Sequence, residues 1–461
     1  MKRMRWFAVV LAFGLVAAAC GSSDDTTTTT AAAAQATTTT AAQATTTTGA
    51  PEAGIKTGIG VDPDTKTIKL GALHDLTGPF SPLVIHINDA MKVYYDTLNA
   101  NGGIDGWMID YQVLDTSYDV PTHLEQYEAL RNDVLALTAS TGTPTSVSAL
   151  PAMTEDNMTF IPLSWYSGWA IPEFDGGLGL EMNTNYCIEA MNLMEFIRDQ
   201  GGQTVAIAGF PSDYGLDFGA GVKLAADFYG MEVVFDGAVI PGQDQTEVIA
   251  GIVASEADWT LVAVNAPVLA ELMGGAFQSG YQGRWTGAGP SYNFALLDSP
   301  VGPLIDTLYY QSAYNVSWGD DAPGNVEMME AMAAAFPDRL PSDAFIIGWN
   351  EGIIMTQVLA DAIAAGDLTR EGVAAAVAAQ TGVDFKGTTP DQSYSGTPDE
   401  YVTRAIAIFN PDLATYTAAG GAAQTLSQEG GTTGSLLEKD FFVSEAAQEF
   451  IFDAPCFSLE G

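Results

Sequence analysis

The chain has 461 residues, of which 57 are acidic and 16 are basic, giving a formal net charge of −41. This balance excludes nucleic-acid binding, because contacts to phosphates need a basic surface. The acidic residues are spread along the whole sequence, which is typical of a solubilised surface; a site for a cationic ligand is the alternative interpretation.

The first twenty residues predict an export signal. A basic start is followed by an apolar run, 6–16, that is too short to cross a bilayer of about 30 Å as a helix, and then by three alanines. Cys20 directly after these small residues resembles a bacterial lipobox. This resemblance implies a signal peptide at 1–20 and a lipidated Cys20 that anchors the chain to the outer face of the cell membrane. Ordinary secretion with a chance cysteine is the alternative.

The next segment, 21–54, is rich in Thr and Ala, and from residue 24 it has almost no apolar bulk. Such a segment cannot offset the entropy lost on ordering, so we expect a disordered stalk. No later apolar stretch reaches the ~18–20 residues of a membrane-spanning helix. The remaining part, about 400 residues, is long enough for two lobes with hydrophobic cores.

Two cysteines lie in this remaining part, Cys187 and Cys456. Export would permit a disulfide between them. The sequence does not show whether the two residues meet, so a disulfide is possible but not predicted.

The body begins with a strand, a helix and a second strand. The apolar run 68–73 ends at the turn 76–80, a helical pattern follows and stops at the glycines of 99–106, and an alternating run covers 108–114. This is a βαβ unit. Ligands of open parallel sheets bind beyond the carboxyl ends of strands, so Phe80 is a candidate pocket wall.

Strand and helix patterns alternate through the rest of the body, which predicts parallel, doubly wound sheets. Further strands are expected at 134–139, 160–163, 205–209, 232–235, 259–264, 284–287 and 403–409. Further helices are expected at 121–133, 186–199, 246–255, 267–280 and 343–365. Two others are expected to end near 157 and 229, and one is expected to follow residue 369.

Three fragments give this pattern a specific likeness: "LTGPF" (76–80), "NANGGIDG" (99–106) and "YQVLDTSYD" (111–119). In this order and spacing they resemble the type I periplasmic binding proteins of the leucine/isoleucine/valine-binding family, the substrate-binding proteins of branched-chain amino acid ABC transporters. The likeness extends over about 67–413. It implies an α/β fold of two doubly wound parallel-sheet lobes joined by a three-strand hinge.

The resemblance also implies where the lobes lie. Lobe one would be 67–182 with 315–383, and lobe two would be 183–314 with 384–425. The segment 426–461 departs from the family pattern and is expected to form a C-terminal extension packed on the body.

In the amino-acid binders of this group, hydroxyl side chains and backbone N–H groups after the third strand hold the ligand carboxylate. The matching segment here implies ligand contacts from Thr143 and Ser146, at a helix N-terminus that favours an anion. A helix N-cap is the alternative role for Ser146. The family's serine pair is Gly142 and Thr143 here, and Pro144 lacks an N–H donor, which leaves carboxylate binding open.

Two further segments match cleft-lining parts of the family. One contains Ser164, Trp165 and Tyr166, whose rings would contact an apolar or cationic ligand, with core packing as the alternative. In lobe two, Tyr214 matches a tyrosine that closes over the ligand, and Asn265 follows a buried strand.

Asp213, beside Tyr214, would lie nearer solvent or bind an ammonium group. The family's lobe-two acidic residue for the ligand amine has no obvious counterpart after position 264. This departure puts a plain branched-chain specificity in doubt.

An enzyme is not expected. His74 and Asp75 follow the first strand, but a catalytic or metal site needs further partners, and His86 and His123 lie in helical patterns. No zinc, phosphate or hydrolase motif is present. We therefore expect no catalytic residues, metal or cofactor, and His74 as a polar residue at the sheet edge.

The resemblance implies a lipid-anchored, monomeric, extracytoplasmic solute-binding protein. It would capture a small polar molecule, an amino acid or a related amide or carboxylate, and deliver it to an ABC permease complex. A receptor of the same fold serving a sensor or partner protein is the alternative, and an exported hydrolase would rest on His74 alone. The sequence does not fix the ligand.

Overall fold

The computed structural model describes residues 54–459. The predicted signal peptide, the predicted lipidation site Cys20 and nearly all of the predicted stalk lie outside this range. None of the helices within it has both the length and the apolar composition needed to cross a lipid bilayer.

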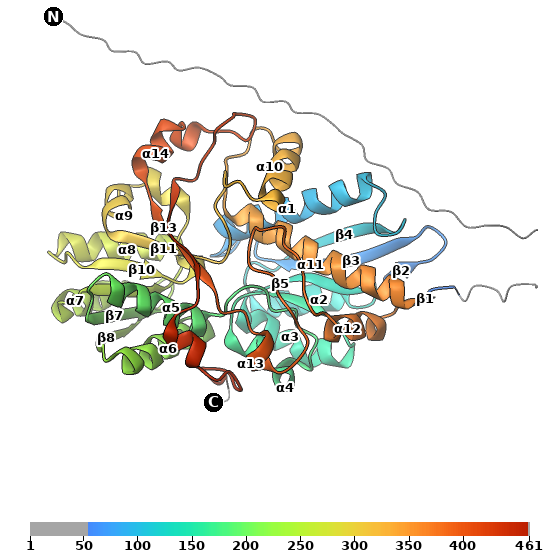
Figure 1. The fold of residues 1–461 in the computed structure, drawn as a ribbon, viewed down its shortest axis with the longest axis horizontal. Helices are drawn as coiled ribbons and strands as arrows, with labels where there is room; N and C mark the ends of the chain where they lie inside the picture. Colours follow the sequence, from blue (N-terminus) through green and yellow to red (C-terminus); the bar gives the residue numbers. More distant parts are fainter. Residues whose placement is uncertain (1–53, 460–461) are drawn as a thin grey trace, which may run out of the picture. The chain divides into compact units, whose positions relative to one another are not determined.

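The first sheet is parallel apart from one short strand at its edge, and it is formed by the early part of the described chain (Figure 1). Every residue of its two last strands is buried, as expected for strands covered on both faces. The strand order is β4 (Met108–Asp115), β3 (Thr67–His74), β5 (Ala136–Thr141) and β6 (Phe160–Leu163), with the short β2 (Val61–Asp62) antiparallel to the start of β3. The connecting helices are α1 (Ser81–Ala100), α2 (Val120–Leu130) and α3 (Thr143–Glu155).

The second sheet has seven strands. In order these are β14 (Ser435–Phe442), β13 (Ile406–Pro411), β11 (Tyr309–Ala313), β10 (Arg284–Gly287), β9 (Trp259–Ala263), β7 (Thr204–Gly209) and β8 (Glu232–Ala238). Its helices are α5 (Tyr186–Asp199), α6 (Asp213–Tyr229), α7 (Thr246–Ser255), α8 (Ala266–Gln278) and α9 (Gly302–Leu308).

This sheet is mixed, not wholly parallel. β13 runs antiparallel to β11, with Ala407 opposite Ala313, and β14 runs antiparallel to β13. The chain leaves β11 at its carboxyl end and returns into β13 at that same end, so the two strands must run in opposite directions.

Between β11 and β13 the chain returns to the first sheet. It forms α10 (Pro323–Ala335), α11 (Ala344–Ala365), the short β12 (Asp367–Leu368), which pairs with β1 (Lys56–Thr57), and α12 (Arg370–Ala378). α11 lies close against α1 because two of its residues are glycines. A Cβ at Gly348 would lie 2.0 Å from the carbonyl oxygen of Ile87, and one at Gly352 would lie 2.3 Å from the Tyr94 ring.

The expected strands and helices are present within a few residues of the expected bounds, but β11, α9, α10, β14 and the two-residue strands β1, β2 and β12 were not expected. β14 reads SLLEKDFF and has two exposed leucines, so its alternation is too weak to identify it as a strand. The remaining short helices are α4 (Pro172–Asp175), α13 (Pro398–Tyr401), α14 (Leu413–Ala418) and α15 (Glu445–Glu449).

Three segments of the chain cross between the sheets and are hydrogen-bonded to one another. Thr184 donates to the carbonyl of Ala405 at 2.6 Å, which joins the first crossing to the third. Thr389, at the start of the third crossing, donates to the carbonyl of Tyr314 in the second at 2.7 Å. These bonds keep the carboxyl ends of the two sheets facing each other.

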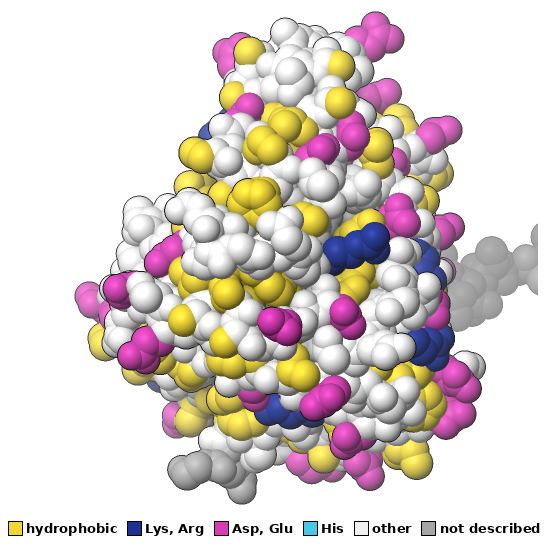
Figure 2. All heavy atoms as spheres, turned by 90° about the vertical axis from the view of Figure 1, so that its left-hand side faces the viewer, with side chains coloured by type: hydrophobic (Ala, Val, Ile, Leu, Met, Phe, Trp, Pro, Cys, Tyr) yellow, Lys and Arg dark blue, Asp and Glu magenta, His cyan; other side chains and the backbone are white. Residues whose placement is uncertain are grey.

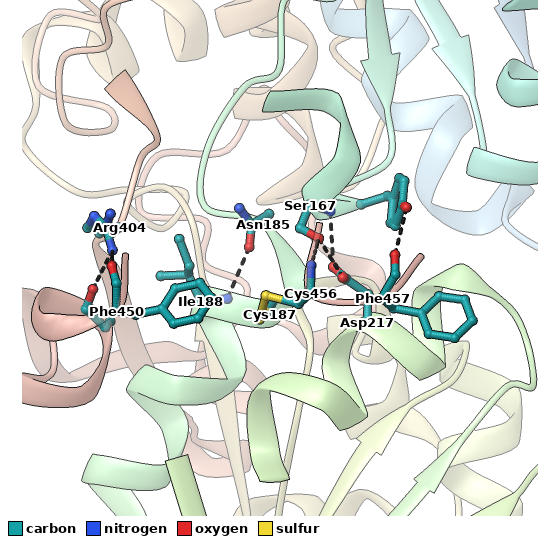
Figure 3. Close-up of a disulfide and its surroundings, with 11 residues drawn as sticks. Ser167, Asn185, Cys187, Ile188, Asp217, Arg404, Phe450, Cys456 and Phe457 are labelled. Atoms are coloured by element: carbon teal, nitrogen blue, oxygen red, sulfur yellow. Dashed lines mark hydrogen bonds between the residues drawn. A yellow bond between two sulfur atoms is a disulfide. The ribbon is translucent and has the colours of Figure 1, made fainter. Parts of the chain in front are cut away.

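The last residues, 443–459, form a segment that we call the C-terminal strap. A disulfide joins Cys456 of the strap to Cys187 of α5, with the two Cα atoms 6.3 Å apart (Figure 3). On the other side, Tyr166 donates to the carbonyl of Phe457 at 2.7 Å, and the backbone N–H of Cys456 donates to the Ser167 hydroxyl at 2.9 Å. The strap therefore bridges the first-sheet segment after β6 and a helix of the second sheet.

Figure 2 shows acidic side chains scattered over one face of the molecule among apolar groups, with few basic ones. The scatter fits an acidic solvated surface better than a single acidic binding patch.

We expect the double variant Cys187→Ser/Cys456→Ser to lose stability by about 2–5 kcal/mol, because the disulfide closes a loop of 269 residues in the unfolded chain. Urea unfolding with and without reductant measures the loss. Reductant should lower the midpoint of the wild type to that of the variant and leave the variant unchanged. Equal midpoints for the oxidised wild type and the variant would contradict this role.

Candidate functional site

A pocket lies where the carboxyl ends of both sheets face each other, which is where open α/β sheets bind ligands. It holds about 390 Å³ of space, including its opening to solvent. The loop after each of the four long strands of the first sheet contributes a residue, namely Phe80, Tyr118, Thr143 and Trp165, and Tyr214 comes from the second sheet. We call this the aromatic pocket, since five aromatic rings, including that of Tyr186, line it.

Phe80 is held in place by the acid before it. The Asp75 carboxylate accepts from the backbone N–H groups of Gly78, at 2.6 Å, and Phe80, at 2.8 Å. This folds the turn back so that the Phe80 ring lies 4.9 Å from the ring of Tyr118.

His74 is fully buried, not at an accessible edge. Its ring nitrogens lie 3.3 Å from the Thr141 hydroxyl and 3.2 Å from that of Tyr111, and burial lowers its pKa to about 3. A neutral imidazole held between hydroxyls packs the end of β3. None of the described residues forms a cluster of acidic, His and Cys side chains able to hold a metal ion.

Tyr118 reaches the pocket because Gly142 has no side chain. Gly142 has a φ of +88°, and a Cβ there would lie 2.3 Å from the Tyr118 ring. Tyr118 itself has a φ of +55°, which is uncommon for a bulky residue. Backbone conformations of this kind are concentrated at ligand sites.

Thr143 and Asp213 meet across the cleft. The Thr143 hydroxyl at the start of α3 lies near the carboxyl group of Asp213 at the start of α6 and lowers its pKa, against the larger effect of burial. Asp213 is 4% exposed, its Oδ2 atom has no hydrogen-bond partner among the described residues, and burial raises its pKa to about 6. A buried acceptor without a donor is costly, so this atom suits a donor brought by a ligand.

The side chains of Ser164 and Trp165 line the pocket at the end of β6. The Ser164 hydroxyl accepts from the Trp169 indole at 2.8 Å, which fixes this segment. Trp165 stacks on Tyr314 with ring centres 4.9 Å apart.

Tyr214 also lies on the wall, with its hydroxyl 2.9 Å from that of Ser291 and its ring 4.5 Å from that of Tyr186.

The structure places three expected ligand residues away from the pocket wall. Ser146 is buried under α3 and donates to the carbonyl of Ser140 at 3.0 Å, because the helix already begins at Thr143 and turns this side chain toward the sheet. Tyr166 points away, toward the C-terminal strap. The Asn265 side chain caps α8, accepting from the N–H of Val268 at 3.2 Å.

Several wall residues were not identified from the sequence. Tyr118 follows the end of β4, so the strand-end rule that selected Phe80 would have found it. Tyr186 and Pro290 carry no comparable signal, because only the crossing between the lobes brings them to the pocket.

A second contact crosses the cleft beside the strap. The Asp217 carboxylate of α6 accepts from the backbone N–H of Ser167 at 3.0 Å and from its hydroxyl at 2.6 Å (Figure 3). Asp217 is fully buried, and this burial raises its pKa to about 7.

The family model described as periplasmic binding protein matches residues 67–420. Among solved structures, the chain is similar to a fatty acid ABC transporter substrate-binding protein from Thermomonospora curvata. The two are 26% identical with a TM-score of 0.77, over 86% of this chain and 97% of that one.

Two further structures share the fold. A branched-chain amino acid ABC transporter protein from Thermus thermophilus with bound valine is 18% identical, with a TM-score of 0.70, over 85% of this chain and 99% of that one. A solute-binding protein from R. palustris in complex with 4-hydroxybenzoate is 14% identical, with a TM-score of 0.67, over 82% of this chain and 97% of that one. No curated protein matched the sequence significantly.

We expect Gly142→Ala to lower stability by about 1–3 kcal/mol, because it adds a side chain at positive φ and pushes on the Tyr118 ring. Gly177→Ala is the matched control: its φ is also positive, at +69°, but the nearest atom would lie 3.9 Å away. Urea unfolding of both variants separates backbone strain from the clash. Equal losses in the two would show that the Tyr118 contact costs nothing.

Asp217 should make stability depend on pH. Its pKa is raised when folded, so its contribution is fully present below about pH 4 and is lost as pH rises through about 7. Between about pH 4 and pH 7, the free energy of unfolding of the wild type should therefore fall with rising pH more steeply than that of Asp217→Asn, by up to about 1.4 kcal/mol per pH unit. Asp227→Asn, an exposed change on the same helix, should keep the wild-type slope. Parallel urea-derived pH profiles for wild type and Asp217→Asn would contradict the assignment.

Proposed function

We propose a function for this chain on the basis that it belongs to the periplasmic binding protein family, a family of solute-binding proteins and not of enzymes. The proposal is that the protein is a lipid-anchored, extracytoplasmic substrate-binding protein. In this proposal it captures a small molecule between two lobes and passes it to an ABC importer. The likeness to the Thermomonospora curvata protein, over nearly its whole length, supports the transport role.

The aromatic pocket carries this proposal. It lies at the carboxyl ends of both sheets, and a ligand there would contact both lobes at once. Such a ligand favours the closed arrangement, because its contacts to the second lobe exist only when the lobes are together. We propose 67–182 with 315–383 as one moving lobe and 183–314 with 384–425 as the other.

The wall chemistry favours a ligand with a large apolar part and an amino group. None of the described residues lining the pocket is Lys, Arg or His, and the acid beside it, Asp213, has a buried oxygen without a donor. A ligand ammonium would supply that donor. A ligand carboxylate would lie near Thr143, at the N-terminus of α3, where backbone N–H groups favour an anion.

An apolar or aromatic α-amino acid, or its amide, meets all of these conditions. Its side chain would lie among the aromatic rings, which also attract a cation. A simple carboxylic acid fits less well, because it would bring a negative charge to Asp213 with no cation to balance it.

We expect leucine or phenylalanine, or their amides, to raise the unfolding temperature of the mature chain. At a ligand concentration of 100 times the Kd, the free energy of unfolding should increase by about 2.7 kcal/mol. Asp213→Asn should weaken amino-acid binding about 10- to 100-fold, since a charge-assisted hydrogen bond is lost. Wild-type affinity should fall as pH drops through about 6, where Asp213 becomes protonated.

Isothermal titration from pH 5 to 8 measures these effects, with Asp227→Asn as an exposed acidic control. Isovalerate, which has the apolar group and carboxylate of such a ligand but no amine, should bind weakly and without dependence on Asp213. Tight isovalerate binding, or silence across the whole panel, would count against the proposed ligand class.

A further inference from the structure

A second hollow adjoins the aromatic pocket, and we call it the adjoining chamber. It holds about 700 Å³ of space, including its opening, and lies between the start of α11, the strand β11 and the loop after β10. Three residues line both hollows: Leu83, Trp165 and Pro290. The two spaces are therefore neighbours that share one partition.

The shared partition includes one aromatic side chain, that of Trp165. Trp165 lies on both walls and stacks on Tyr314 at an interplanar angle of 29°. Tyr314 is fixed, because its hydroxyl donates to the buried Glu189 carboxylate at 2.7 Å. A shift of the Trp165 ring along this fixed aromatic surface would connect the two spaces.

The chamber has mostly apolar walls and two hydroxyl groups without a hydrogen-bond partner among the described residues, those of Tyr292 and the fully buried Ser312. Phe294, Ile347 and Phe409 supply apolar surface. Tyr292 is 8% exposed, and its hydroxyl has no hydrogen-bond partner among the described residues. Burying a hydroxyl without a partner costs free energy, so this atom points to a ligand group that reaches it.

We propose that the two hollows together hold one elongated amphiphile. Its amino-acid head lies at Thr143 and Asp213, and its apolar tail passes Trp165 into the adjoining chamber. The Tyr292 hydroxyl marks the place where a polar group on the tail binds. This inference rests on the proposed function and narrows it to ligands longer than the common aliphatic amino acids.

A homologous series of 2-aminoalkanoic acids, from four to twelve carbons, tests the tail by isothermal titration against the mature chain. The head stays constant along the series, so any change in affinity belongs to the tail. Affinity should rise about fourfold for each added methylene group until the chamber is full, as expected for burial of a CH₂ group.

Blocking variants then locate the tail. Ala313→Leu adds bulk to a half-buried position on the chamber wall and outside the aromatic pocket. It should end the rise at a shorter chain length while four- and five-carbon members bind as to wild type. Val316→Phe fills the same chamber from the neighbouring crossing and gives a second test if the first variant folds poorly.

The outcomes separate the two proposals. If short members bind and affinity does not grow with length, or if both blocking variants weaken all lengths equally, the tail chamber is refuted and the proposed function stands. If no member binds at any length, the amino-acid head itself is wrong and both proposals fail.

Tyr292→Phe provides a readout that a packing role would not give. Unliganded, the variant should be as stable as wild type or more so, because it removes a buried hydroxyl without a partner. It should weaken binding of a 10-hydroxy-2-aminodecanoic acid about 5- to 20-fold more than that of the unsubstituted acid. Equal losses for the two probes would remove Tyr292 from the site.

Discussion

Thr184, Tyr314 and Thr389 lie on three separate crossings between the two sheets, and hydrogen bonds join these crossings to one another. The rest of the architecture depends on this constraint. It turns the carboxyl ends of both sheets toward the same space, so strand-end loops that are far apart in the sequence become opposite walls of one pocket. It also forces β13 to run against its neighbour, since the chain re-enters the second sheet at the end where it left.

The cleft between the sheets concentrates buried acids. Burial raises the pKa of Asp213 to about 6, of Asp217 to about 7 and of Glu189 to about 8. Asp217 and Glu189 have donors that fix particular neighbours, namely Ser167 and Tyr314. Asp213 differs, because one of its oxygens has no donor. The same burial that lowers stability near neutral pH thus leaves the Oδ2 atom of Asp213 available to a ligand donor.

The C-terminal strap adds a second link between the lobes, beyond the segment that matches the family. Its disulfide fixes it to α5, and its backbone contacts Tyr166 and Ser167 on the other side of the cleft. Any opening of the two lobes would have to stretch or release these contacts. Tyr166, expected on the pocket wall, is instead part of this link, which explains why its ring faces the strap.

The sequence by itself determined the alternating strands and helices, the two-lobe fold and the side of the sheets where a ligand is expected. The strands and helices follow from local signals, namely buried apolar runs and glycine stops. The rule that loops after parallel strands face the ligand selected Phe80, and the family resemblance selected Thr143, Ser164, Trp165 and Tyr214, all of which line the aromatic pocket. Only the tertiary structure decided the direction of each loop side chain, the pairing of β14, the meeting of Cys187 with Cys456 and the second chamber. Each of these depends on contacts between segments far apart in the chain, and no local pattern encodes the distance between them.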